Sequence, residues 1–339
     1  MTLRVGLVGL GMMGGAHFLA WRGIDGAEVT AICDIRPERL EGDWAGEAGN
    51  LDTGAEGVIS ADRRYTDIQR MLDDGELDVV DVCTPTDTHC ELATAALGAG
   101  LDVFCEKPLA CTASDARAAV AAAEQAGRRL MVGHVLRFWP EYLHFHRVLR
   151  DGSLGALRWA RFWRCGAWPG SAWFSDPARS GGAVLDLHIH DADAVRWLFG
   201  LPRAVRSTGV DEGQGVSRIA TEYLFGDGHP VVLAEGGWSA GPVPFSMGAE
   251  LEFQGGTLLY DTARQPALML YPAAGPAEAV EPVAANPYQE ELRYFAECLR
   301  ADQAPDRMSA RQAAESVALI EAEVESVRSG QEVAITFAG

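Results

Sequence analysis

Apolar residues in the first part of the chain gather in short continuous runs that alternate with segments of helical periodicity. Such runs indicate buried strands, because the strands of a parallel sheet are covered on both faces. Strands are expected at residues 3–8, 27–33, 78–83, 101–105 and 129–133, and helices at 13–23, 88–99 and 114–126. Thr112 or Ser114 is expected to cap the last helix, and Gly127 to end it. The alternation predicts an α/β domain with a doubly wound parallel sheet over residues 1–133.

The pattern changes after residue 134, where apolar and polar residues begin to alternate with a period of two. Strands are expected at 157–163, 219–225, 231–238 and 249–253, and helices at about 187–199, 288–301 and 309–328. This predicts a second α/β domain over residues 134–339 with a mostly antiparallel sheet, whose last helices could pack back on the first domain. The Gly- and acid-rich stretch 41–64 is expected to be a long surface loop, and 272–287 an exposed connection.

Composition narrows the classes of partner. The 48 Asp and Glu against 28 Lys and Arg give a net charge of -20, and both predicted domains are acidic. This argues against nucleic acid or an anionic membrane as the main partner. No apolar run approaches the roughly 18 residues of a membrane span. The seven scattered cysteines contain no CxxC pair, which favours reduced thiols and a cytoplasmic protein.

A glycine-rich segment between the first strand and the first helix fits G-x-G-x-x-G. It reads Gly9-Leu10-Gly11-Met12-Met13-Gly14. Gly9 permits a tight turn, Gly11 allows the backbone to approach a pyrophosphate, and Gly14 allows the helix to pack closely on the strand. Asp34 ends the second strand, where a carboxylate accepts ribose hydroxyls and repels a 2′-phosphate. The pattern favours NAD over NADP, although Arg36 could swing onto a 2′-phosphate.

Two further segments follow predicted strands, at the sheet edge where ligands of open parallel sheets bind. Thr84 and Pro85 lie where a nicotinamide ribose would pass. His89 either contributes to this site or only caps and packs the next helix. Lys107, in the segment Glu106-Lys107-Pro108, is the single lysine of a chain with 27 arginines. Arginine cannot give up a proton in proteins whereas lysine can, so this position favours proton transfer or the orientation of a hydroxyl.

A third cluster of polar residues surrounds His190. If the chain is helical from about residue 186, Asp186 and His190 share one face and Asp193 joins them. A carboxylate beside an imidazole orients it, which makes His190 a candidate general base toward a hydroxyl. A metal site remains the alternative, because His188-x-His190 with flanking aspartates has ligand character. No other His or Cys cluster supplies a clear third ligand, so no metal is expected.

Five of the nine tryptophans fall within residues 139–173, in the first part of the second predicted domain. Trp168 and Trp173, next to Pro169 and Gly170, are expected to line a substrate site with Arg137, since indole faces suit the CH face of a sugar. Trp159 and Trp163 are expected in the sheet core or at a subunit interface.

Taken together, these motifs resemble the Gfo/Idh/MocA oxidoreductases. The resemblance rests on the glycine loop with His17, on Asp34, and on four segments: Thr84-Pro85…His89, Glu106-Lys107-Pro108, Gly133-His134…Arg137-Phe138 and Gly181-Gly182…Asp186…His190…Asp193. It implies a Rossmann domain followed by an α/β domain with a large open sheet that often forms the dimer interface. It also implies that Lys107, Asp186 and His190 are the catalytic trio and that Glu106 lies near the nicotinamide ribose. The family often has Gly where this chain has His188, which marks a subgroup.

The resemblance further implies NAD-dependent hydride transfer to or from a secondary alcohol of a sugar or cyclitol, by a homodimer or homotetramer. Two other functions stay open at this point. One is redox-assisted cleavage of a glycosidic bond, as in some relatives of the family. The other is a non-catalytic nucleotide-sensing regulator with the same fold, against which the intact trio argues.

Overall fold

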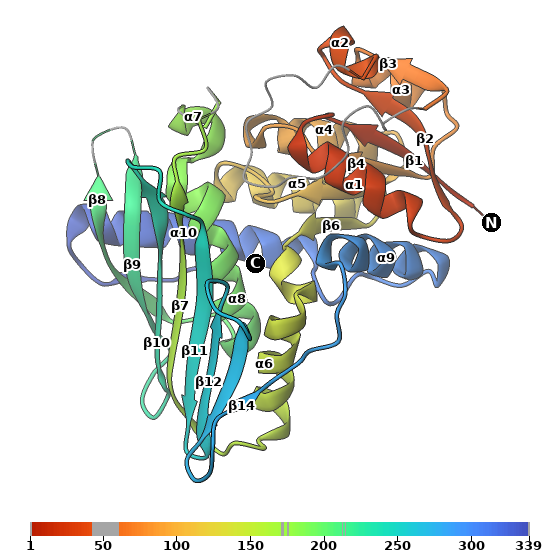
Figure 1. Ribbon diagram of the computed structural model, residues 1–339. Helices are drawn as coiled ribbons and strands as arrows, with labels where there is room; N and C mark the ends of the chain where they lie inside the picture. Colours follow the sequence, from red (N-terminus) through yellow and green to blue (C-terminus); the bar gives the residue numbers. More distant parts are fainter. Residues whose placement is uncertain are drawn as a thin grey trace. The chain divides into compact units, whose positions relative to one another are not determined.

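The computed structural model divides into two compact units, which are considered separately (Figure 1). It describes residues 2–42, 61–170, 173–174, 176–211, 213 and 215–337. The first unit comprises Met1–Val135, Pro169–Ser180 and Asn286–Val317; the second comprises Leu136–Trp168, Gly181–Ala285 and Ala318–Gly339. The chain thus returns twice to the first unit after the point where the sequence pattern changes.

The first unit is built on a six-stranded parallel sheet. Its strand order, β3-β2-β1-β4-β5-β6, is that of a doubly wound dinucleotide-binding fold. The strands are β1 (Leu3–Val8), β2 (Ala27–Cys33), β3 (Arg63–Tyr65), β4 (Val79–Val82), β5 (Asp102–Glu106) and β6 (Leu130–Gly133). The helices are α1 (Met12–Arg22), α2 (Pro37–Leu40), α3 (Ile68–Asp73), α4 (Thr86–Gly98), α5 (Ala113–Ala126), α7 (Pro177–Ser180) and α9 (Pro287–Arg300). The fold class predicted for this part of the chain is confirmed.

Local signals in the sequence set several of these boundaries. Every residue of β4, β5 and β6 is buried, as expected of central parallel strands. The Thr112 hydroxyl accepts the backbone N–H of Asp115, and Gly127 ends α5 with a left-handed φ of 61°. The expected loop at 41–64 is shortened, because β3 already begins at Arg63; its residues 43–60 lie outside the described part of the chain.

The second unit is built on a nine-stranded sheet of order β14-β13-β12-β11-β7-β10-β9-β8-β15. All neighbouring strands are antiparallel except β7 and β10, so the predicted mostly antiparallel sheet is confirmed. The strands are β7 (Leu157–Ala167), β8 (Ala204–Asp211), β9 (Val216–Leu224), β10 (Val231–Ser239), β11 (Ser246–Phe253), β12 (Gly256–Asp261), β13 (Leu268–Pro272), β14 (Glu278–Ala279) and β15 (Val333–Ala334). The pattern missed five of these strands, β8 and β12–β15.

The helical segments in this half of the chain are a 3-10 turn (Val135–Phe138), α6 (Pro140–Asp151), a π-helical turn (Val184–His188), α8 (Ile189–Phe199) and α10 (Ala310–Ser329), whose second half belongs to the second unit. No helix in the described ranges combines the length and apolar character that crossing a membrane requires.

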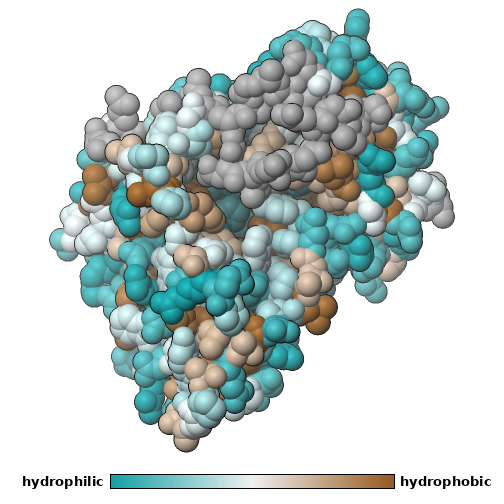
Figure 2. Space-filling view, viewed as in Figure 1, coloured by the Kyte–Doolittle hydropathy of each residue, from teal (hydrophilic) through white to brown (hydrophobic). Residues whose placement is uncertain are grey.

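The nine-stranded sheet has one buried face and one open face. Along β7, Ala160, Phe162 and Arg164 are buried, whereas Trp159 and Trp163 alternate with them and stay half-buried. The two tryptophans therefore lie on the open face of the sheet. Of the two positions expected for them, the sheet core is wrong, and the subunit interface stays a prediction. A shallow pocket of about 470 Å³ on this face is lined by Arg161, Trp163, Glu250, Thr257, Leu259, Asp261, Arg264 and Tyr271. Figure 2 shows hydrophilic and hydrophobic residues interspersed over the strands of this sheet.

Candidate active site

The glycine loop joins β1 to α1 by a turn with little room for side chains. Gly9 has a left-handed φ of 88°, and a Cβ there would lie 2.6 Å from the backbone oxygen of Cys83. A Cβ on Gly14 would lie 2.0 Å from the Gly9 oxygen. Gly11 is the N-cap of α1, and among the described residues no side chain caps the start of the helix at Met12 and Met13. A helix start of this kind offers backbone donors and a positive dipole end to a pyrophosphate.

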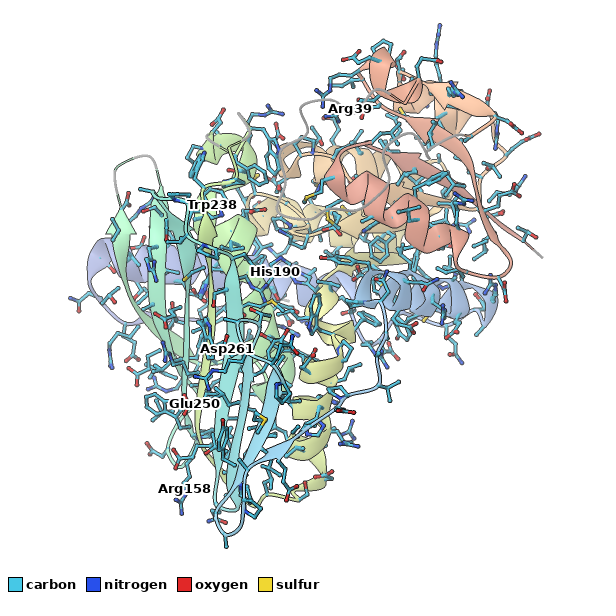
Figure 3. The ribbon with its side chains drawn as sticks, in the orientation of Figure 1. Arg39, Arg158, His190, Trp238, Glu250 and Asp261 are labelled. Carbon is cyan, nitrogen blue, oxygen red and sulfur yellow. The ribbon has the colours of Figure 1, made fainter. Side chains whose placement is uncertain are left out.

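Asp34 lies where β2 ends and fixes the same loop. One carboxylate oxygen, Oδ2, accepts the Leu10 backbone N–H at 2.8 Å, and the other accepts the Arg36 N–H at 2.9 Å. The guanidinium of Arg39 lies 3.2 Å from Oδ2 and neutralises the nearly buried charge (Figure 3). The sequence pattern indicated Arg36 but gave no sign of Arg39. Arg39 follows Asp34 by five residues, and helix α2 brings its guanidinium to the Asp34 carboxylate.

His89 connects two of the predicted cofactor loops. Its Nε2 lies 2.7 Å from the Thr84 backbone oxygen, and its Nδ1 lies 2.8 Å from that of Pro108. The ring is buried, and this burial lowers the pKa of His89 below its ordinary value although both carbonyls favour a protonated ring. His89 thus fixes the Thr84-Pro85 loop against the backbone that follows Lys107. Its direct contact with a cofactor stays a prediction.

Glu106, the last residue of β5, is held by a buried histidine. His17 on α1 contacts Glu106 Oε1 through Nε2 at 3.1 Å and Asp81 Oδ2 through Nδ1 at 2.9 Å. The other oxygen of Glu106 accepts the Lys107 backbone N–H at 2.9 Å. Burial alone would raise the pKa of Glu106, but the hydrogen bond and charge of His17 outweigh it and lower the pKa. The backbone of Lys107 is therefore tied through an ionised carboxylate to the helix of the glycine loop.

A third carboxyl, Glu291 of α9, adjoins this group. Its side chain is fully buried, and neither of its oxygens has a hydrogen-bond partner within the described residues. Burial, followed by the charge of Glu106, raises the pKa of Glu291 well above its ordinary value, so the neutral acid is favoured. In the described ranges, ligand-type side chains gather closely enough for a metal ion only around His17, with Asp81 and Cys83 or with Glu106 and Glu291.

The third polar cluster of the sequence lies on an irregular helix in the second unit. Gly181 and Gly182 both have left-handed φ values, 72° and 74°, and lead into the π-helical turn Val184–His188. The prediction of a regular helix from residue 186 is therefore wrong at its start. Asp186 lies in the π turn, and His190 lies in the first turn of α8. Both of these side chains are half-buried, while residues 187–189 between them are buried.

The two aspartates near His190 are bound by arginines. Asp193 accepts Nε and NH2 of Arg137 at 2.9 and 2.7 Å, and Arg164 contacts Asp191 through Nε at 2.8 Å. Arg137 has no exposed surface, which favours a structural role over the substrate contact expected from the sequence. With both aspartates engaged, and with His188 bound to Glu323 of α10 at 2.9 Å, the alternative metal site at His188-x-His190 is not favoured.

Aromatic side chains lie at one end of the large sheet. Trp168 is 43% exposed and packs edge-on against Trp238 at a ring distance of 4.7 Å. Trp238 is the last residue but one of β10, and Figure 3 shows it toward the same end of the sheet as His190. Trp238 was missed because a period-two strand pattern gives it no distinguishing mark. Trp173 stacks on Phe174 at 3.9 Å and belongs to the first unit.

Comparison with known proteins places this arrangement in a family. Residues 3–134 match the description "Oxidoreductase family, NAD-binding Rossmann fold", and residues 142–260 match "GFO/IDH/MocA C-terminal domain". The D-apiose dehydrogenase of Paraburkholderia graminis is 33% identical over 350 residues, which cover 96% of this chain and 88% of that protein. The chain belongs to the Gfo/Idh/MocA oxidoreductases.

Other members of the Gfo/Idh/MocA family show how far the similarity extends. Inositol 2-dehydrogenase 2 of Saccharopolyspora erythraea is 35% identical over 222 residues, covering 64% of this chain and 60% of that protein. A levoglucosan dehydrogenase in complex with NADH superposes with a TM-score of 0.86 at 21% identity over the whole of both chains. An oxidoreductase of Agrobacterium radiobacter, in complex with NAD+, L-tartaric acid and magnesium, superposes with a TM-score of 0.82 at 23% identity over 99% of each chain. At these identities the structural likeness shows the fold.

Membership of the Gfo/Idh/MocA family confirms three expectations from the sequence. The chain is an NAD-dependent oxidoreductase, its cofactor is NAD, and its first domain is a Rossmann domain. The structure places Lys107 and Glu106 at the carboxyl end of β5 in the first unit, and Asp186 and His190 on the irregular helix of the second.

Proposed function

We propose that this chain is a dehydrogenase that oxidises a secondary alcohol of a sugar or cyclitol with NAD+, or catalyses the reverse reduction. The substrate class is supported by the relatives named D-apiose dehydrogenase and inositol 2-dehydrogenase. The observation that carries the proposal is the position of Lys107, the only lysine of the chain, directly after the anchored Glu106 at the cofactor-binding edge of an NAD-binding sheet. A homo-oligomer that contacts through the open face of the large sheet remains a prediction from the resemblance.

The residues of the first unit fit NAD. The glycine loop has no room for side chains between β1 and α1, and no side chain in the described part of the chain caps the first turn of α1, where phosphate oxygens would bind. Gly9, Gly11 and Gly14 with Met12 and Met13 would receive the pyrophosphate, and Asp34 the adenosine ribose. Thr84, Pro85 and Glu106 would lie along the nicotinamide ribose. When bound, NAD+ supplies the acceptor for the hydride that leaves the carbinol carbon.

The side chains of this protein handle the proton in the proposed reaction. Lys107 and His190 would bind the substrate hydroxyl, and one of them takes its proton as the C–H bond breaks and the carbonyl forms. Asp186 orients His190 and stabilises its charged form. Trp168 and Trp173 would contact the CH faces of the substrate.

A panel of aldoses and cyclitols with NAD+, followed by NADH absorbance, tests the substrate class. Lys107→Arg tests the chemistry, because it keeps the positive charge and removes the proton that can be exchanged. We expect kcat to fall by about 10²-fold or more, with the melting shift caused by NADH unchanged. The pH dependence of kcat in Lys107→Arg and in His190→Gln identifies the proton acceptor. Because the acceptor must be unprotonated to take the proton, kcat falls at low pH, and the variant that lacks the acceptor loses this fall. Near-normal turnover of Lys107→Arg would overturn the assignment of Lys107 to the reacting hydroxyl.

A further inference from the structure

His188 lies in the sequence midway between Asp186 and His190, the two candidate catalytic residues of the second unit. It is the last residue of the π turn, and its side chain is fully buried, whereas Asp186 and His190 are half-buried. Its Nε2 lies 2.9 Å from Oε2 of Glu323, a fully buried carboxylate on α10. The half-buried candidates are thus separated by a residue anchored into the interior of the unit.

The anchor is supported by two strands of the large sheet. The Thr221 hydroxyl of β9 donates to Glu323 Oε2 at 3.0 Å, and the Tyr223 hydroxyl lies 3.4 Å from His188 Nε2. Gly236 of β10 makes room for the ring, because a Cβ there would lie 2.7 Å from His188 Nδ1. Three separate elements are therefore shaped around this one imidazole.

The surroundings of His188 favour its protonated form, which is costly to bury. Burial lowers the pKa of His188, but the charge and hydrogen bond of Glu323 outweigh burial, with a smaller contribution from Asp191 and opposition from Arg164, so the pKa is raised overall. His188 Nδ1 and Glu323 Oε1 have no partner within the described part of the chain. Buried ion pairs of this kind contribute little to net stability but can specify one conformation. π turns are rare and occur mostly as single turns within α-helices, frequently at functional sites, so a specific contact that holds this turn is of interest.

We propose that His188 and Glu323 are positioning residues that hold the π turn in one register, and thereby set the directions of Asp186 and His190. The inference rests on the proposed function for its kinetic consequence. With the ion pair intact, residues 187–189 stay buried and the flanking side chains emerge at fixed positions. Without it, the turn exchanges between π and α registers, and His190 no longer meets the substrate hydroxyl in one geometry.

Glu323→Gln tests this proposal with little change in shape. Ser326→Ala is the matched control, because Ser326 lies one turn further along α10, accepts the Ser207 backbone N–H of β8 at 2.9 Å and donates to the Gln331 oxygen at 2.6 Å, with no hydrogen bond to the π turn within the described residues. We expect Glu323→Gln to lower kcat by about tenfold to 10²-fold, as misplacement of a catalytic group does. The melting shift caused by NADH should stay unchanged, and Ser326→Ala should keep kcat within about twofold. A native-like kcat in folded Glu323→Gln would overturn the proposal.

A second readout does not depend on turnover. In protein with isotopically labelled histidines, His190→Gln identifies the His190 ring signals among the eight histidines. Glu323→Gln should shift or broaden those signals, and Ser326→Ala should leave them in place; unchanged signals in Glu323→Gln would refute the positioning role. If the native chain oxidises no polyol, the proposed function fails while this readout still tests the anchor. If Glu323→Gln does not fold, the double variant His188→Gln with Glu323→Gln leaves no buried charge unpaired and is measured in its place.

Discussion

Lys107 and His190 each lie close in sequence to a buried histidine–carboxylate pair, but the two pairs have different surroundings. Around His17 there are three carboxyls, Asp81, Glu106 and Glu291, for one imidazole. Around His188 the direct partners are the Glu323 carboxylate and the Tyr223 hydroxyl, and the Thr221 hydroxyl donates to the same carboxylate. The first cluster therefore holds surplus acid and must keep one carboxyl neutral, whereas the second is balanced.

Because the two clusters differ in their number of carboxyls, we expect the loss of either histidine–carboxylate pair to have different consequences. In the first unit, His17 neutralises carboxylates that would otherwise be buried together, so its loss affects stability foremost. In the second unit, His188 and Glu323 neutralise only each other, so their pairing serves conformation more than stability. Variants that remove one group at a time from either cluster can separate these roles.

Loss of the His17 imidazole is expected to have the largest effect. His17→Phe keeps the ring volume but leaves Asp81 and Glu106 buried without their shared cation, and such a loss costs about 3–5 kcal/mol. Urea unfolding followed by fluorescence measures the change. His89→Phe is the control, since among the described residues the nitrogens of that buried ring bond two backbone carbonyls and no carboxylate, and its loss should cost about 1–3 kcal/mol. Equal losses in the two variants would show that the carboxylates around His17 bring no special cost.

Glu291→Gln sharpens the comparison through pH. The folded state raises the pKa of Glu291 above its ordinary value of 4.5, so above that pH the folded state binds a proton that the unfolded state has released. The free energy of unfolding then falls as pH rises toward the folded pKa. Glu291→Gln removes this loss and should be more stable than the native chain at pH 8, by about 1.4 kcal/mol for each unit of the raised pKa.

The curves of the two proteins should converge below about pH 4.5, where Glu291 is protonated in both the folded and the unfolded state. Unfolding measured in urea from acid to alkaline pH shows whether they do. Native and variant curves that run parallel over this range would mean that Glu291 is ionised in the folded protein.

Thr221→Val is expected to have the smallest effect. It removes one donor to Glu323 while His188 still pairs with the carboxylate, so we expect a loss of about 1 kcal/mol in unfolding free energy. Thr221→Ser keeps the hydroxyl and should retain most of the stability, as thermal unfolding of both variants would show. A larger loss in the serine variant would assign the effect to packing of the methyl group and not to the hydrogen bond.

The sequence predicted best what depends on local chemistry. The glycine loop, the Thr112 cap and the buried strands of the first unit follow from neighbouring residues, and the structure has them where they are expected. The placement of Lys107 at the end of β5 likewise follows from the strand that precedes it. Short strands such as β3 and β15 were missed, because segments of two or three residues show no periodicity.

Contacts between distant residues could not be predicted in the same way. His17 meets Glu106 across 89 residues, and His188 meets Glu323 across 135. Glu323 and Glu291 lie on amphipathic helices where a glutamate ordinarily marks the solvent face, so nothing in the local pattern shows that they are buried. The π turn was missed for a related reason: the composition of 184–188 fits either helical register, and the choice depends on the partner of His188.

The missing side chain at Gly236 constrains how this site could have arisen. A methyl group there would lie 2.7 Å from Nδ1 and 3.1 Å from Cβ of His188, so no larger residue at 236 is compatible with the histidine. In evolution, glycine at 236 must therefore have come before histidine at 188, or together with it. Glycine at 236 tolerates a small residue at 188, whereas histidine at 188 does not tolerate a larger residue at 236. Among descendants of a common ancestor the two positions should covary, and transplanting the His188–Glu323 pair into a relative requires the glycine as well.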